Sequence, residues 1–129
     1  MRQKKFSTKS RIQSFSFALN GLKIMIREEQ NARIHLAVAI FISIVGFLLK
    51  LSIFEWISIV FSIGLVISLE LINSAIEYMA DFIYPGKNET IKSIKDVSAA
   101  SVLVGSITAL VIGWIVFIPK IWAIWKTFI

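Results

Sequence analysis

The segment Glu70-Leu-Ile-Asn-Ser-Ala-Ile-Glu-Tyr-Met-Ala-Asp81 closes a long apolar run and carries several polar side chains. On a helix that turns about 100° per residue, its polar residues share one face within about 80° of arc. These residues, which we call the polar seam, are Glu70, Asn73, Glu77 and Asp81. Acidic residues in membrane helices are rare and usually functional. The polar seam therefore predicts a functional site on a membrane-spanning helix.

The composition of the chain agrees with a membrane protein. The 129 residues are 57% hydrophobic with a mean hydropathy of +0.78, whereas globular proteins are about 45–50% apolar. The length predicts one domain, residues 1–129. The absence of cysteine excludes disulfides and thiolate metal sites, and the single His35 excludes a zinc site made only of histidines within one chain. We attribute the net charge of +6 to a cytoplasmic face, and we expect no nucleic acid partner.

The hydropathy pattern predicts an all-α integral membrane protein. Residues 1–9 are expected to form a basic tail. Residues 10–29 have helical periodicity, with basic residues around an apolar stripe, and are expected to lie as an amphipathic helix in the membrane interface. Three transmembrane helices are expected at 34–49, 54–84 and 97–118, the last followed by Pro119.

The distribution of basic residues predicts the orientation. Eleven Lys and Arg residues lie before the first span or in the loop between the second and third spans, and three lie on the opposite side. By the positive-inside rule, the amino terminus and that loop are cytoplasmic, and the carboxyl terminus is outside. The site carried by the polar seam is therefore expected at the cytoplasmic interface.

The third span has a small residue at every fourth position: Ser101, Gly105, Ala109 and Gly113. Small residues allow helix backbones to approach closely. We interpret this ladder as a packing surface. The ladder also suggests oligomerisation, because three spans alone enclose a row of polar residues poorly.

The polar residues near the cytoplasmic boundary are those that phosphoryl transfer requires. Glu29 and Glu77 come from separate elements and can share one Mg²⁺, which typically takes one or two carboxylates together with phosphate oxygens and water. Lys95 and Arg11 can hold a polyphosphate, and Glu70 is the candidate general base for a hydroxyl. The soluble nucleotide-binding motifs G-x-x-x-x-G-K-[ST] and G-x-G-x-x-G are absent.

The motif E-x-x-N-S-A-I-E-x-x-x-D at 70–81, followed by K-D-x-x-A-A at 95–100, resembles the signature of the prokaryotic diacylglycerol kinase family. F-x-F-A-x-x-G at 15–21 and E-x-N-x-R-I-H at 29–35 also resemble that family, especially its undecaprenol kinase branch. The similarity covers about residues 10–119. It implies a homotrimeric enzyme of the bacterial cytoplasmic membrane that transfers the γ-phosphate of ATP to a lipid hydroxyl with Mg²⁺.

The resemblance also implies roles for individual residues. Glu70 matches the catalytic base, and Glu29 and Glu77 match the metal-binding carboxylates. The positions expected to contact ATP are Arg11, Phe17, Glu29, Glu77, Asp81, Gly86, Lys87, Asn88, Lys95 and Asp96. The positions expected to contact the lipid are Arg11, Asn31, Arg33, Glu70 and Asn73. Phe17 stands where some members have a tyrosine, so a hydroxyl is lost there, and the register of Arg11 is uncertain by one residue.

Two lipid substrates and two other functions stay open at this point. Undecaprenol and diacylglycerol both fit, and the segment 31–35 slightly favours undecaprenol. A small oligomeric proton-coupled transporter also places a carboxylate in a helix bundle, but the clustering of the acidic residues with Lys95 and Asp96 at one interface favours nucleotide. A non-catalytic assembly subunit would tolerate Glu70→Gln. The sequence does not decide the oligomeric state or whether one active site is shared between subunits.

Overall fold

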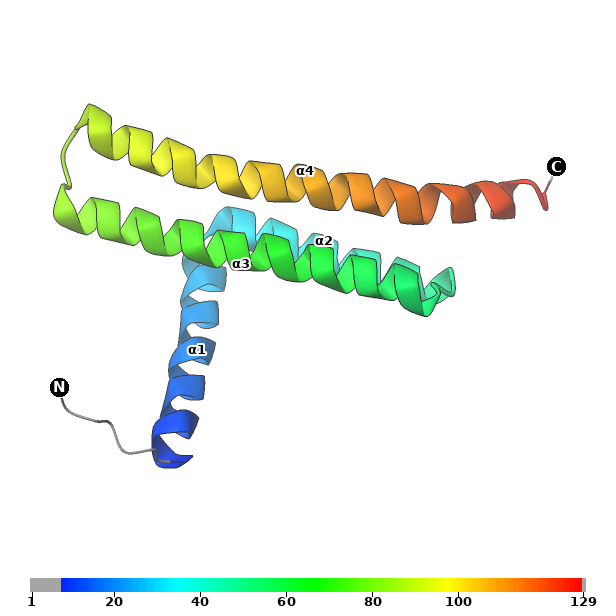
Figure 1. Ribbon diagram of the computed structural model, residues 1–129, viewed down its shortest axis with the longest axis horizontal. Helices are drawn as coiled ribbons and strands as arrows, with labels where there is room; N and C mark the ends of the chain where they lie inside the picture. The colour runs from blue at the N-terminus through cyan, green and yellow to red at the C-terminus, as the bar shows by residue number, and fades with distance from the viewer. Residues whose placement is uncertain (1–7, 129) are drawn as a thin grey trace.

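The computed structural model describes residues 8–128. In this part of the chain all regular structure is helical: α1 (Thr8–Glu28), α2 (Gln30–Leu48), α3 (Ile53–Ile83) and α4 (Glu89–Trp125). Figure 1 shows α2, α3 and α4 running alongside one another, with α1 projecting away from them. The expected basic tail lies mostly in residues 1–7, outside the described residues, and Thr8 and Lys9 already belong to α1.

A single residue separates α1 from α2. The backbone of Glu29 is extended, with φ −98° and ψ 117°. Its N–H still donates to the carbonyl of Met25 over 2.9 Å, and its own carbonyl accepts from the N–H of Arg33 over 3.4 Å. The helical hydrogen bonds on both sides are thus kept while the chain changes direction. This bend places Glu29 between the projecting helix and the bundle.

The turn between α2 and α3 is short and tightly packed. Lys50 adopts a positive φ of 49°, and Ser52 and Glu55 form a reciprocal capping box that starts α3. Gly46 faces this turn, and a Cβ there would lie 2.9 Å from the side chain of Leu51 and 3.0 Å from that of Trp56. Only glycine therefore fits at position 46 without movement of its neighbours.

The second connection comprises residues 84–88. Asn88 caps α4, because its Oδ1 accepts from the N–H groups of Thr90 over 2.9 Å and Ile91 over 3.1 Å. α4 then begins eight residues before the expected span and continues seven residues beyond it, through Pro119. A proline inside a helix removes one hydrogen-bond donor and does not always end the helix, and here the apolar sequence that follows keeps the helical form.

The main packing contact joins α3 and α4, which lie antiparallel (Figure 1). An apolar cluster near one end contains Leu51, Ile59, Val116 and Phe117. Most other large apolar side chains of the three long helices are exposed, up to 89% for Phe82. α2, α3 and α4 are each long and apolar enough to cross a membrane. The expected all-helical fold with three candidate spans is confirmed.

Candidate functional site

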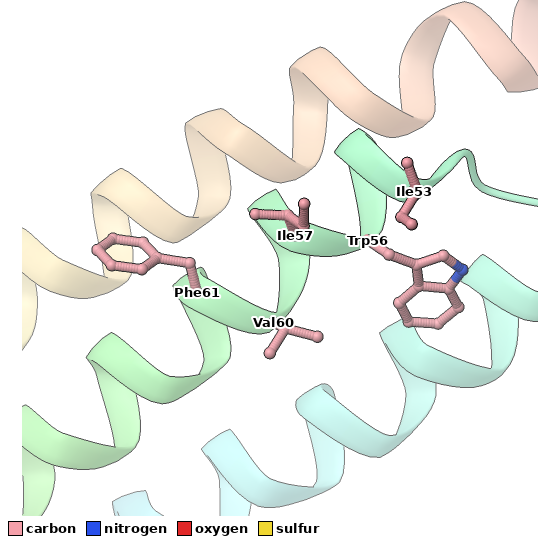
Figure 2. A pocket seen from close by; sticks show the side chains of 5 residues that line it. All are labelled: Ile53, Trp56, Ile57, Val60 and Phe61. Atoms are coloured by element: carbon pink, nitrogen blue, oxygen red, sulfur yellow. The ribbon is translucent and has the colours of Figure 1, made fainter.

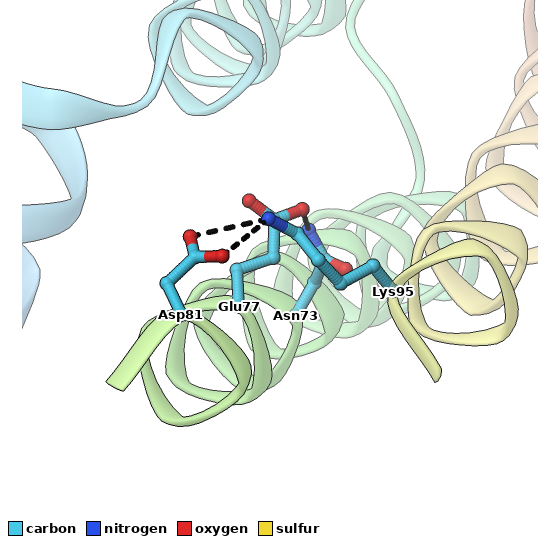
Figure 3. A network of polar contacts seen from close by, with 4 residues as sticks. All are labelled: Asn73, Glu77, Asp81 and Lys95. Atoms are coloured by element: carbon cyan, nitrogen blue, oxygen red, sulfur yellow. Dashed lines mark hydrogen bonds and ion pairs between the residues drawn. The ribbon is translucent and has the colours of Figure 1, made fainter. Parts of the chain in front are cut away.

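The polar seam occupies the last part of α3, and burial decreases along it. Glu70 is 3% exposed and Asn73 is also buried, Glu77 is half-buried, and the side chain of Asp81 is 61% exposed. Figure 3 shows Asn73, Glu77 and Asp81 on one face of α3, with Lys95 reaching toward them from α4. The helical spacing predicted from the sequence therefore produces a row of polar groups that leads from the interior to the surface.

Two contacts order the exposed half of the seam (Figure 3). Nδ2 of Asn73 donates to Oε1 of Glu77 over 3.1 Å. Nζ of Lys95 donates to both carboxylate oxygens of Asp81, over 2.9 and 3.1 Å. A cation and a carboxylate from two helices thus meet at the water end of the seam, as a site for a charged ligand requires.

The buried half of the seam keeps acceptors without donors. Oε1 of Glu70 and Oδ1 of Asn73 are buried and accept no hydrogen bond from residues 8–128. Nε2 of His35, on α2, lies 3.1 Å from Oε1 of Glu70, which is an ion-pair separation without good hydrogen-bond alignment. Buried polar atoms normally have partners, so these two acceptors fit a ligand that brings a donor, such as a hydroxyl.

Glu29 approaches the seam from the α1–α2 bend. It is half-buried, and with Glu77 it acts electrostatically on Glu70. Among residues 8–128, no group of three or more His, Cys, Asp or Glu side chains forms a ready-made metal site. Two carboxylates fit Mg²⁺ rather than a fully protein-bound metal, because Mg²⁺ completes its octahedron with phosphate oxygens and water. Glu29 and Glu77 would hold it.

The other residues predicted for the site are exposed, and those on α1 lie on the helix that projects away from the bundle, so the structure does not bring them to the seam (Figure 1). Arg11 and Phe17 are exposed on α1, and Asn31 and Arg33 are exposed at the start of α2. The remaining predicted positions lie in the 84–88 connection or on the first turns of α4: Gly86, Lys87, Asn88 and Asp96. All four are exposed, and Asn88 has a structural role as the cap of α4.

The structure brings two further residues to the site that the sequence patterns did not assign to it. His35 contacts Glu70, as described above. The hydroxyl of Tyr78 donates to Oε2 of Glu28 over 2.9 Å and joins α3 to the end of α1. Helical periodicity reports neighbours within one helix only, so it carried no signal for either contact. For His35, its place in the E-x-N-x-R-I-H motif was the one available sign.

At the end of the bundle away from Asp81, the described residues form no comparable row of polar side chains. Glu55 is held by Ser52 and lies 3.1 Å from Nζ of Lys120. An apolar hollow lies nearby, and Figure 2 shows the α3 residues that line it: Ile53, Trp56, Ile57, Val60 and Phe61. No carboxylate, amide or hydroxyl side chain lines this hollow, and it is not a candidate catalytic site.

Comparisons with known proteins show which family this chain resembles. The family model for prokaryotic diacylglycerol kinase matches residues 16–117. An undecaprenol kinase of Bacillus subtilis (strain 168) is 40% identical over 108 residues, which cover 84% of this chain and 88% of the relative. A diacylglycerol kinase of Synechocystis sp. (strain ATCC 27184 / PCC 6803 / Kazusa) is 28% identical over 109 residues, covering 84% of this chain and 62% of that protein.

The residues matched by the family model include Glu29 and the whole polar seam. The comparisons give no support to the alternative of a transporter. The family model covers most of the chain, and the undecaprenol kinase relative matches over nearly its whole length. The chain therefore belongs to the prokaryotic diacylglycerol kinase family and is a membrane lipid kinase.

Proposed function

We propose that this enzyme transfers the γ-phosphate of Mg-ATP to the hydroxyl of a membrane lipid at the cytoplasmic interface. The observation that carries the proposal is the graded burial of the polar seam. Glu70 lies at the buried end of the seam, where we place the lipid hydroxyl, and the Asp81–Lys95 pair lies at the exposed end, where we place the water-soluble nucleotide. The two reactants can then meet between these ends.

Three residues of the seam, together with Glu29, have a role in the proposed reaction. Glu70 accepts the proton of the lipid hydroxyl while the hydroxyl oxygen attacks the γ-phosphorus, and the bond from phosphorus to the ADP oxygen breaks. Asn73 lies next to Glu70 along the seam and presents a buried carbonyl oxygen to the reacting hydroxyl. Glu29 and Glu77 would hold Mg²⁺, which would neutralise charge on the phosphates.

We assign the other predicted positions to binding of the nucleotide and the lipid headgroup. Lys95 can turn from Asp81 to neutralise phosphate charge, with Arg11 as a second cation. The exposed 84–88 connection, together with Phe17 and Asp96, would border the nucleotide, and Asn31 and Arg33 would border the lipid headgroup region. α1 would lie in the membrane interface, because it leaves the bundle at the level of Glu29 and is exposed over residues 8–20 (Figure 1).

Undecaprenol is the substrate we propose first. The undecaprenol kinase relative is the more similar of the two reported and is matched over more of its own length. The segment 31–35 favours the same lipid. We also propose a homotrimer in the bacterial cytoplasmic membrane, with the amino terminus inside, on the basis of the family and of the distribution of basic residues.

The test is transfer of label from γ-labelled Mg-ATP to undecaprenol and to diacylglycerol, each in separate mixed micelles. We expect label in undecaprenol, and Glu70→Gln should lower the rate about 10²- to 10⁴-fold, the usual contribution of a general base. Glu55→Gln is the matched control on the same helix and should leave the rate within about twofold of wild type, because a surface pair contributes little.

The outcomes separate the parts of the proposal. Label in diacylglycerol alone would overturn the choice of lipid and keep the kinase. Equal loss of activity in Glu70→Gln and Glu55→Gln would show that Glu70 is not the base. No transfer to either lipid by a protein that does not bind ATP would overturn the proposed function.

A further inference from the structure

His35 is the single histidine of the chain and lies in the second turn of α2. Its Nε2 is 3.1 Å from Oε1 of Glu70 on α3, although the two residues are 35 positions apart in the sequence. The imidazole is 27% exposed, whereas Glu70 is 3% exposed. A partly accessible side chain on one helix therefore contacts the buried carboxylate of another.

The carboxylate of Glu70 has few other partners. Ser74 donates to the backbone carbonyl of Glu70 and not to its side chain, and the amide nitrogen of Asn73 donates to Glu77. Glu29 and Glu77 act on Glu70 with charge of the same sign. Within residues 8–128, His35 is the side chain that approaches this carboxylate within ion-pair distance, and the contact is an ion pair when the imidazole is protonated. A buried carboxylate among like charges needs such a partner.

The contact also restrains the orientation of the carboxylate. The terminal torsion of a glutamate side chain is broad and does not fix the carboxylate plane by itself. The imidazole beside Oε1 limits that rotation. Because Oε1 accepts no well-aligned hydrogen bond, it keeps a lone pair for a hydroxyl proton. The contact thus orients the base and leaves it available.

We propose that His35 is a positioning residue that holds the Glu70 carboxylate in the orientation needed to take the proton of the lipid hydroxyl. The inference rests on the proposed function. Glu70 forms the new O–H bond, the lipid oxygen forms the new bond to phosphorus, and ADP leaves. His35 gains and loses no atom over this step, so its effect is on the geometry of Glu70.

The contact itself can be tested without measuring activity. The imidazole is the only one in the chain, so labelling histidine with ¹⁵N gives the resonances of one side chain in the full-length protein in nanodiscs. We expect Glu70→Gln to shift both imidazole nitrogens and Glu55→Gln to leave them unchanged. Equal resonances in wild type and Glu70→Gln would overturn the proposal.

The kinetic test compares three substitutions of His35: alanine, which removes the imidazole, and two amides with side chains of different length. His35→Ala should lower kcat about tenfold to a hundredfold, the scale of a misplaced catalytic group, with the KM values for ATP and lipid unchanged. His35→Gln places its amide nitrogen near the position of Nε2 and should restore most of kcat, whereas His35→Asn is too short and should not. A purely structural role would lower thermal stability in all three variants alike.

The outcomes distinguish this inference from the proposed function. An active wild type in which His35→Ala keeps full kcat would overturn the role of His35 and leave the kinase intact. A change in KM for ATP with unchanged kcat would also overturn it, because that result assigns His35 to nucleotide binding. A wild type that phosphorylates neither undecaprenol nor diacylglycerol would overturn the proposed function, and the catalytic role of His35 with it.

Discussion

At the scale of single residues, the Asp81–Lys95 pair shows how an ordinary surface contact can serve a ligand. Both side chains are partly exposed, 61% and 34%, and pairs of this kind contribute only about 0–1 kcal/mol to stability. The fold therefore does not depend on this contact. Lys95 can leave Asp81 for a phosphate with little loss of folding free energy.

We therefore expect a substitution of Lys95 to weaken ATP binding without lowering the stability of the fold. Lys95→Met should raise KM for ATP about tenfold to a hundredfold, because a hydrogen bond to a charged group contributes about 1.5–3 kcal/mol. Its unfolding temperature in micelles should stay within about 2 °C of wild type. Steady-state kinetics with varied ATP, and thermal unfolding of the same samples, measure the two effects. Lys92→Met, three residues earlier on α4, is the control; a similar rise in KM there would refute a specific role for Lys95.

At the scale of elements, helical periodicity predicted much of what the structure shows. The apolar runs indicated the helices, and the spacing within 70–81 placed the seam on one face. The sequence predicted a break between two helices after Glu29, but not that one extended residue makes it, because no glycine or proline lies between Gly21 and Gly46 to mark the position. That bend is accompanied by the Tyr78–Glu28 hydrogen bond between helices. Contacts of this kind, like that of His35 with Glu70, depend on how helices pack and have no local pattern.

The ladder of small residues on α4 was predicted to be a packing surface, and the structure confirms packing at one of its steps. A Cβ at Gly105 would meet the side chain of Leu69 on α3, so this step of the ladder packs within the chain. A Cβ at Gly113 meets nothing within 4 Å in the chain. The two glycines therefore belong to different surfaces, although the sequence places them in one row.

Paired substitutions test this distinction. Gly105→Ile should lower the free energy of unfolding by about 1–3 kcal/mol, the range for overpacking a closed contact. Gly113→Ile should change the unfolding of the single chain little. Thermal unfolding in detergent, with the oligomeric state recorded by light scattering, measures both effects. Dissociation of an oligomer by Gly113→Ile, with the chain still folded, would place that glycine at a subunit contact. Equal destabilisation by both variants would contradict the separation of the two surfaces.

At the scale of the whole molecule, the orientation in the membrane determines which solution supplies the nucleotide. The 84–88 connection and the carboxyl terminus lie at opposite ends of α4 (Figure 1). If α4 crosses the membrane once, these two ends face different compartments. The excess of basic residues supports our proposal that the connection is cytoplasmic.

The absence of native cysteine makes this orientation measurable with single reporters. Thr127→Cys in intact spheroplasts should react with a membrane-impermeant maleimide. Lys87→Cys should react only after the membrane is opened. Both variants should be labelled equally in detergent, which serves as the control for intrinsic reactivity. Labelling of Lys87→Cys in sealed cells would reverse the proposed topology and remove the active site from the cytoplasmic pool of ATP.

The decreasing burial along α3 has a consequence for how the two substrates meet. Asp81 is eleven positions after Glu70, and a helix rises about 1.5 Å per residue, so the seam is about 16 Å long along the helix axis. This is about half the thickness of the hydrocarbon layer, roughly 30 Å. A long-chain alcohol can then keep its tail among other lipids throughout turnover, because the polar seam leads from the exposed end of α3 toward the interior of the membrane. Once phosphorylated, the same lipid end carries charge and is favoured toward the surface. Product release therefore follows the polarity gradient of the helix.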